Sequence, residues 1–217
     1  MTSLLAAATL RILMIGNSLT YANDLPATVE HLIDGTGIEA TVDSVATPDM
    51  SLGDHWERAT ARQAIRDGRY DVVVLQQGPS AAPESRMILK RDAARFAQLI
   101  RKSGGRPALY MVWPALSRPQ DWAGVDTSYS AAAEACECLL LPAGRAFRLT
   151  LEEKGDSPLF AEDGFHPSRM GSDLAALVIA AGILGKPVET FPARPSLPEE
   201  TMRVLRNAAG DALATAD

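Results

Sequence analysis

Two short segments at opposite ends of the sequence hold the three residue types that can activate an alcohol as a nucleophile. Gly16–Thr20 (GNSLT) follows a short apolar run and places a serine hydroxyl in a tight polar turn. Asp163–His166 (DGFH) places a carboxylate and an imidazole on one loop. A serine hydroxyl is a poor nucleophile until a base takes its proton, and that base needs a carboxylate on its other nitrogen. Ser18, His166 and Asp163 are therefore the candidate nucleophile, base and orienting carboxylate.

Each segment also has an ordinary structural interpretation when it is taken alone. Serine and asparagine in a turn often cap a helix, and the backbone of His166 could simply lead into the helix expected after it. The other two histidines, His31 and His55, lie in helical patterns, where we expect packed or surface roles. The chemical interpretation therefore depends on whether the fold brings Ser18 and His166 together.

Short apolar runs alternate with longer amphipathic patterns, which predicts a parallel α/β layout. The expected strands are Arg11–Ile15, Glu39–Val45, Asp71–Leu75, Pro107–Trp113 and Glu137–Leu141. The expected helices are Leu25–Asp34, Asp54–Asp67, Pro83–Ser103, Tyr129–Cys136, Ala143–Glu153 and Ser168–Leu184. In such a sheet, ligands bind at the carboxyl ends of the strands, so chemistry is expected in the residues that follow each strand.

The two polar segments together resemble the first and last blocks of the SGNH/GDSL hydrolase superfamily, G-D-S-L and D-x-x-H. Asn17 stands where the first block has aspartate, which is a departure at a position other than the nucleophile. The resemblance covers nearly the whole chain. It implies a single domain over residues 1–217, a three-layer α/β/α sandwich around a five-stranded parallel sheet of flavodoxin-like order. It also implies hydrolysis of carboxylic esters through an acyl-enzyme, with no metal or organic cofactor.

The resemblance further implies an oxyanion hole, to which the superfamily's second and third blocks contribute. Gly53 is the candidate glycine of the second block, and the Ser18 backbone N–H is a further donor. The third block's asparagine is absent, but Gln76 and Gln77 precede its expected place, and a glutamine side chain carries the same N–H donors. Gln77 and the residues after it (QGPS) look like a segment of the sialate and xylan acetylesterase branches. We expect one of these two glutamines to donate to the oxyanion, and the alternative is that both face solvent at a strand end.

The substrate expected from this resemblance is a small ester, with an acylated carbohydrate first. Candidate substrate-contacting residues are Asn17, Trp113 and Trp122, although either tryptophan could instead pack in the core or at its rim. Two rival functions stay open. One is a thioesterase or lysophospholipase acting on lipids, and the other is a binding module that keeps the fold without turnover.

Charge, hydropathy and cysteine content limit the possible partners and the compartment of the protein. The formal net charge of −6, with basic residues interleaved among acidic ones, makes nucleic acid an unexpected partner. No apolar run approaches the roughly 20 residues of a membrane span, and the segment before Arg11 lacks the basic residues of a signal sequence, so we expect a cytoplasmic protein. The only cysteines, Cys136 and Cys138, are expected to be reduced thiols, because neighbours this close seldom pair and no further metal ligands accompany them. The oligomeric state stays open.

Overall fold

The computed structural model describes residues 9–154, 158–192 and 197–215, and in this part of the chain five parallel strands form one sheet. The strand order is β2-β1-β3-β4-β5, and every neighbouring pair is parallel. This is the flavodoxin-like order, so the expected fold class is confirmed. The strands are β1 (Leu10–Gly16), β2 (Ala40–Ala46), β3 (Val72–Leu75), β4 (Arg106–Tyr110) and β5 (Leu139–Leu141).

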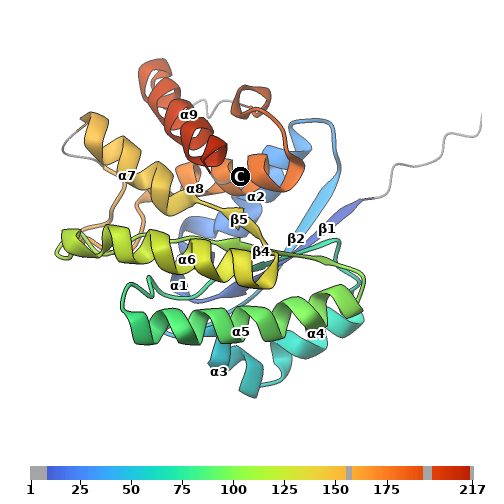
Figure 1. Ribbon diagram of the computed structural model, residues 1–217. Helices are drawn as coiled ribbons and strands as arrows, with labels where there is room; N and C mark the ends of the chain where they lie inside the picture. The colour runs from blue at the N-terminus through green and yellow to red at the C-terminus, as the bar shows by residue number, and fades with distance from the viewer. Residues whose placement is uncertain (1–8, 155–157, 193–196, 216–217) are drawn as a thin grey trace, which may run out of the picture.

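Helices cover both faces of the sheet (Figure 1). One face carries α3, α4, α5 and α6, and the other carries α2, α7 and α8, with α9 packed on α7 and α8. The α-helices are α1 (Ser18–Tyr21), α2 (Leu25–Asp34), α3 (Leu52–Glu57), α4 (Thr60–Gly68), α5 (Pro83–Lys102), α6 (Trp122–Cys136), α7 (Ala143–Lys154), α8 (Arg169–Leu184) and α9 (Glu199–Ala214). No helix in the described ranges is long and apolar enough to cross a membrane.

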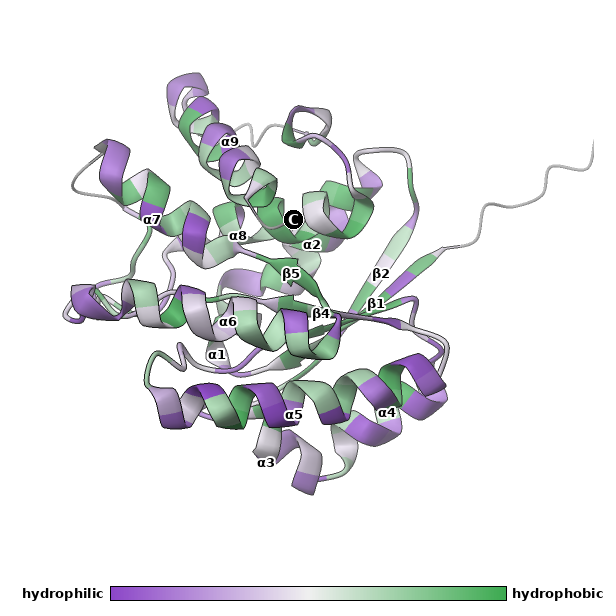
Figure 2. Cartoon of the chain, in the orientation of Figure 1, coloured by the Kyte–Doolittle hydropathy of each residue, from purple (hydrophilic) through white to green (hydrophobic). Residues whose placement is uncertain are grey.

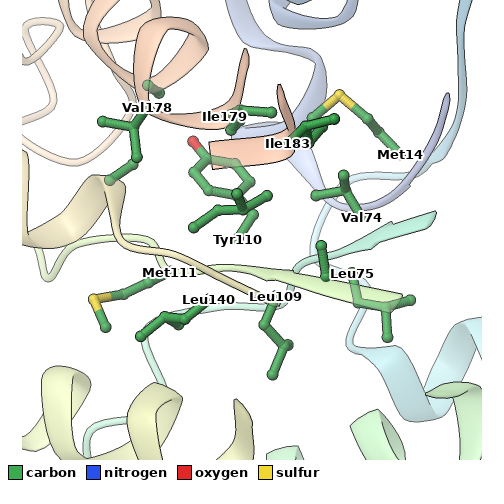
Figure 3. Packing of buried hydrophobic residues seen from close by; sticks show 14 of the residues in the cluster. Met14, Val74, Leu75, Leu109, Tyr110, Met111, Leu140, Val178, Ile179 and Ile183 are labelled. Carbon is green, nitrogen blue, oxygen red and sulfur yellow. The ribbon is translucent and has the colours of Figure 1, made fainter. Parts of the chain in front are cut away.

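The sheet forms the middle of the core because its central strands are apolar on both faces. All residues of β3 are buried, as they must be in a strand that has helices above and below it. Side chains alternate across the sheet, so that Tyr110 lies with Ile179 and Ile183 of α8 while Leu109 points to the opposite side (Figure 3). Figure 2 shows the same segregation, with hydrophobic colour on the strands and hydrophilic stretches along α4 and α5.

Several boundaries differ from the sequence expectation. The helix expected over Asp54–Asp67 is two helices, α3 and α4, because Ala59 adopts a left-handed conformation with φ of 64° between them. Helix α6 starts at Trp122 rather than Tyr129, and β4 ends at Tyr110 rather than Trp113. Helix α9 was not expected, since its apolar positions are spaced among many polar ones.

The expectation of two reduced thiols is wrong for this structure. Cys136 and Cys138 form a disulfide, with their Cα atoms 5.3 Å apart. Glu137 between them has a φ of 50°, and this left-handed turn at the end of α6 folds the chain back enough to place the two Cα atoms in the usual disulfide range. The expectation about an N-terminal targeting segment concerns residues 1–8, which lie outside the described residues.

Candidate active site

The turn after β1 presents Ser18 at the carboxyl edge of the sheet. Asn17 is the N-cap of the short helix α1, and its side chain accepts a hydrogen bond from the Leu19 backbone N–H at 3.2 Å. The capping geometry leaves Ser18 as the first residue of the helix. Gly16 is required here for space, because a Cβ at this position would lie 2.2 Å from both Gln76 Oε1 and Thr20 Oγ1.

The loop between α7 and α8 carries Asp163 and His166 and is fastened at both sides. Trp113 Nε1 donates to the Phe165 carbonyl at 3.0 Å, and the side chain of Asn23 donates to the Pro167 carbonyl at 2.8 Å. These contacts come from the segment that follows β4 and from the segment that follows α1. The loop is therefore held against the same sheet edge that carries Ser18.

The structure brings Ser18, His166 and Asp163 into one hydrogen-bonded chain. His166 Nε2 lies 3.0 Å from Ser18 Oγ, and His166 Nδ1 lies 2.5 Å from Asp163 Oδ2. Ionised Asp163 can only accept, so Nδ1 carries the ring proton and Nε2 is free to accept from the serine hydroxyl. This is the tautomer that a general base toward Ser18 requires.

The electrostatics of Asp163 fit this arrangement. The hydrogen bond with His166, together with the backbone N–H of Phe165, lowers the pKa of Asp163 to about 2. Its other oxygen, Oδ1, accepts from the N–H groups of Phe165 and His166, each at 2.9 Å. The side chains of His166 and Asp163 are 41% and 49% exposed, so solvent and a substrate can reach these two residues.

Two backbone N–H groups near the serine are without partners among the described residues. They belong to Ser18, at the start of α1, and Gly53, at the start of α3. The neighbouring Leu52 and Asp54 N–H groups are used, by Gln77 Oε1 at 3.3 Å and by the Ser51 hydroxyl at 3.2 Å. The first N–H groups of a helix have no intrahelical partner, and such groups can receive a negatively charged oxygen.

The two glutamines differ in what they can do. Gln76 is fully buried, its Oε1 accepts from the Asn17 N–H and the Thr20 hydroxyl, both at 2.8 Å, and its Nε2 donates to the Gln77 carbonyl at 2.7 Å. Gln76 therefore cannot be the oxyanion donor, which was one of the two alternatives predicted from the sequence. Its amide is buried, and both its oxygen and its nitrogen already make hydrogen bonds within the protein. Gln77 Nε2 donates one N–H to the Ser80 hydroxyl at 2.9 Å, which leaves its second amide N–H.

The residues expected to contact substrate are placed differently from that expectation. Trp113 is fully buried and stacks on Phe147 with ring centroids 3.4 Å apart, so it cannot form a pocket wall. Asn17 is also buried, and it caps α1 and donates to the Met50 carbonyl at 3.3 Å. Trp122 lines a cavity of about 460 Å³ between α6, α7 and α9, and the residues around that cavity do not include Ser18 or His166. In all three cases the packing of neighbouring elements decided the position.

His55 is a residue of this site that the sequence did not single out. Its ring is 2% exposed, and Nε2 lies 2.7 Å from the Gly16 carbonyl oxygen. A carbonyl only accepts, so Nε2 carries a proton and His55 ties α3, with Gly53, to the end of β1. Burial lowers the pKa of His55. The only sequence feature that linked His55 to the site was its position two residues after Gly53. A histidine that merely packs in the core could stand at the same position.

No group of three or more histidine, cysteine or acidic residues suited to hold a metal ion occurs in the ranges that the structure describes. The site is thus built from a serine, a histidine, an aspartate and backbone amides.

Solved structures with the same architecture identify the class of fold. A protein from Slackia heliotrinireducens, called "a putative SGNH hydrolase", is 28% identical, with a TM-score of 0.71 over 81% of this chain and 100% of that one. A DUF4886 family protein from Bacteroides uniformis is 17% identical, with a TM-score of 0.82 over 95% of each chain. The acetyl xylan esterase AlAXEase is 14% identical, with a TM-score of 0.65 over 80% of this chain and 100% of that one.

These likenesses define the fold as a three-layer α/β/α sandwich around a five-stranded parallel sheet. The chain has the fold of the SGNH/GDSL hydrolase superfamily, and the resemblance stated from its sequence is confirmed at that level. No protein-family model matches the sequence, and no curated protein matches it.

Proposed function

We propose that this protein is a serine hydrolase that cleaves carboxylic esters through an acyl-enzyme, with residues 1–217 acting as one domain. The observation that carries the proposal is the chain from Ser18 Oγ through His166 to Asp163, with contacts of 3.0 and 2.5 Å. An unreactive serine turn would not need an imidazole accepting from its hydroxyl and a carboxylate fixing the tautomer.

In the acylation step, His166 Nε2 takes the Ser18 proton as Oγ attacks the ester carbonyl. Asp163 stabilises the imidazolium, and the bond to the leaving alcohol breaks as His166 returns the proton to that oxygen. Water then attacks the acyl-enzyme with His166 again as the base, and the products are a carboxylic acid and free Ser18. These steps need no cofactor.

The oxyanion formed in each step would be held by the free N–H groups of Ser18 and Gly53. Gln77 is the remaining candidate for a third donor, through its second amide N–H. Tyr129 supports this position, because burial raises the pKa of its phenol and the protonated phenol donates to the Gln77 carbonyl at 2.5 Å. A Cβ at Gly53 would lie 3.0 Å from Asp92 Oδ2, so a larger residue there would require the buried Asp92 to shift.

A short-acyl ester, with acylated carbohydrate first, is our proposed substrate class. The Gln77–Ser80 segment supports it through its resemblance to acetylesterase branches. A second candidate is a lipid-directed acyl hydrolase, which is favoured by two exposed apolar side chains near the site, Tyr21 and Leu116. Tyr21 ends α1, the helix that begins at Ser18, and the Leu116 backbone N–H donates to the Gly164 carbonyl in the loop that carries His166. Hydrolysis of para-nitrophenyl esters of two to twelve carbons distinguishes the two, and inactivity on all of them, with no labelling of Ser18 by a fluorophosphonate, would indicate the binding module instead.

The compartment is also a matter of proposal. We expected a cytoplasmic protein, but the Cys136–Cys138 disulfide favours an oxidising compartment, since cytosolic thiols are kept reduced.

A further inference from the structure

A second cavity lies where α3, α4 and α5 meet, and its lining residues do not include Ser18, His166 or Asp163. Its volume is about 470 Å³, and its lining consists of Trp56, Arg66, Arg95, Gln98, Leu99, Lys102 and Ser103. Three of these side chains are cationic and none is acidic. This is unusual in a protein whose net charge is −6.

The three lining cations come from two packed helices, Arg66 from α4 and Arg95 and Lys102 from one face of α5. Arg62 is not part of the lining but lies one turn before Arg66 on α4, and we call these four residues the cationic cluster. Like charges at such spacing repel one another, so the cluster opposes folding unless something compensates it. The compensation within the protein is incomplete.

Carboxylates reach only one member of this cluster in the described part of the chain. Arg95 contacts Asp92 Oδ1 at 3.3 Å, and Glu57 at the long distance of 4.0 Å. Arg66 and Lys102 are exposed and have no ion pair or hydrogen bond among the described residues. Arg62 Nε is buried with no hydrogen-bond partner, and its guanidinium lies 5.3 Å from the Trp56 ring centroid.

Trp56 organises the centre of the cluster. Arg95 lies 4.6 Å from its ring centroid and Arg62 lies 5.3 Å from it, so the indole holds two guanidinium groups close together. Phe96 packs edge-on against the same ring at 5.1 Å. Of the two, Arg95 lines the cavity, and its contact with the indole restricts its guanidinium, so an anion that binds there has less side-chain entropy to remove.

We propose that this cavity is a binding site for the phosphate group of a small molecule. A phosphate is the anion that this donor set fits, because arginine presents planar pairs of N–H donors and lysine adds a mobile charge. A cavity of about 470 Å³ that is open to solvent can admit a small phosphate ester. The site is separate from Ser18 and does not depend on the proposed ester hydrolysis.

The test is a titration of the whole protein with inorganic phosphate, followed by ¹H–¹⁵N NMR. The indole N–H signal of Trp56, assigned with Trp56→Phe, reports the cavity, and sodium chloride keeps the ionic strength constant. We expect saturable shifts of this signal with a dissociation constant on the order of 1 mM. Pyrophosphate, which carries more charge, is expected to bind more tightly.

Single charge removals decide whether the cavity is responsible. Arg66→Gln and Lys102→Gln should each weaken phosphate binding about tenfold, the usual effect of losing one charge-assisted hydrogen bond. Lys90→Gln is the matched control, because Lys90 is exposed on the same helix α5 but does not line the cavity. The proposal is overturned if chloride alone gives the same shifts, if phosphate gives none, or if Lys90→Gln weakens binding as much as Lys102→Gln. The four substituted residues lie on helices, Trp56 on α3, Arg66 on α4, and Lys90 and Lys102 on α5. We therefore expect each variant to keep the sheet, and circular dichroism checks this.

Discussion

Replacing Gln76 by alanine should destabilise the protein strongly, whereas replacing Gln77 should mainly lower turnover. Gln76 is fully buried and makes three hydrogen bonds, so its loss leaves the Asn17 N–H and the Thr20 hydroxyl without their acceptor. A buried donor left unsatisfied costs about 1–3 kcal/mol, and two of them give an expected loss of about 2–6 kcal/mol. This is a large part of the about 5–15 kcal/mol that stabilises a typical domain.

The matched variant Gln77→Ala loses one 3.3 Å contact to the Leu52 N–H and one to Ser80. We expect it to cost about 1 kcal/mol of stability, and to reduce kcat by about 10²–10³ with little change in KM if Gln77 donates to the oxyanion. Urea unfolding followed by circular dichroism measures the first effect, and ester hydrolysis measures the second. The reasoning would be refuted by a Gln76→Ala protein within about 0.5 kcal/mol of wild type.

Gln76→Glu provides a control of nearly the same shape. A carboxylate at this position would face the Gln77 carbonyl, to which the amide now donates at 2.7 Å. We therefore expect burial and this contact to raise the pKa of the new carboxyl in the folded state. Because the unfolded chain ionises near pH 4.3, the variant should be closest to wild type below that pH and should lose stability as pH rises through the folded pKa.

Five further outcomes are expected. Ser18→Ala should reduce ester hydrolysis to the roughly 10³–10⁴-fold over water that binding and oxyanion terms supply, and normal kinetics in this variant would place the nucleophile elsewhere. The pKa of Asp163, about 2, means that this carboxylate stays ionised in the folded protein above about pH 4. An acid limb of the kcat/KM profile above that pH must therefore come from another group, and NMR of the Asp163 carboxylate should show it unprotonated throughout that limb. His55→Leu should lower kcat about tenfold with little change in KM, with partial recovery in His55→Gln, which can still donate to the end of β1. Since burial lowers the pKa of His55 below its usual 6.5, stability should fall as pH drops below about 6.5, and chemical denaturation of His55→Leu should show a weaker dependence there. Cys136 and Cys138 should resist alkylation until a reductant is added, and mass spectrometry that finds both alkylated without reductant would contradict the disulfide.

The sequence determined the layout of the fold and the pair of segments that meet. Alternating apolar runs and amphipathic helices are local patterns, and they predicted a parallel α/β layout. The strand order β2-β1-β3-β4-β5 was expected from the resemblance to the SGNH/GDSL superfamily. Ser18 directly follows β1, and the loop with Asp163 and His166 directly precedes α8, so the sequence pointed to both segments. Residue types alone suggested the chemistry.

Only the tertiary structure decided the roles of side chains whose local pattern fits more than one role. Trp113 follows a strand like a pocket wall, yet the packing of Phe147 against it buries it completely. Gln76 and Gln77 are adjacent and identical in type, and they differ because one points into the turn of Ser18 and the other toward α3. The partner of His55, the Gly16 carbonyl, lies 39 residues away in sequence. Such contacts depend on which groups the packed sheet and helices bring within about 3 Å, and a one-dimensional pattern does not contain that distance.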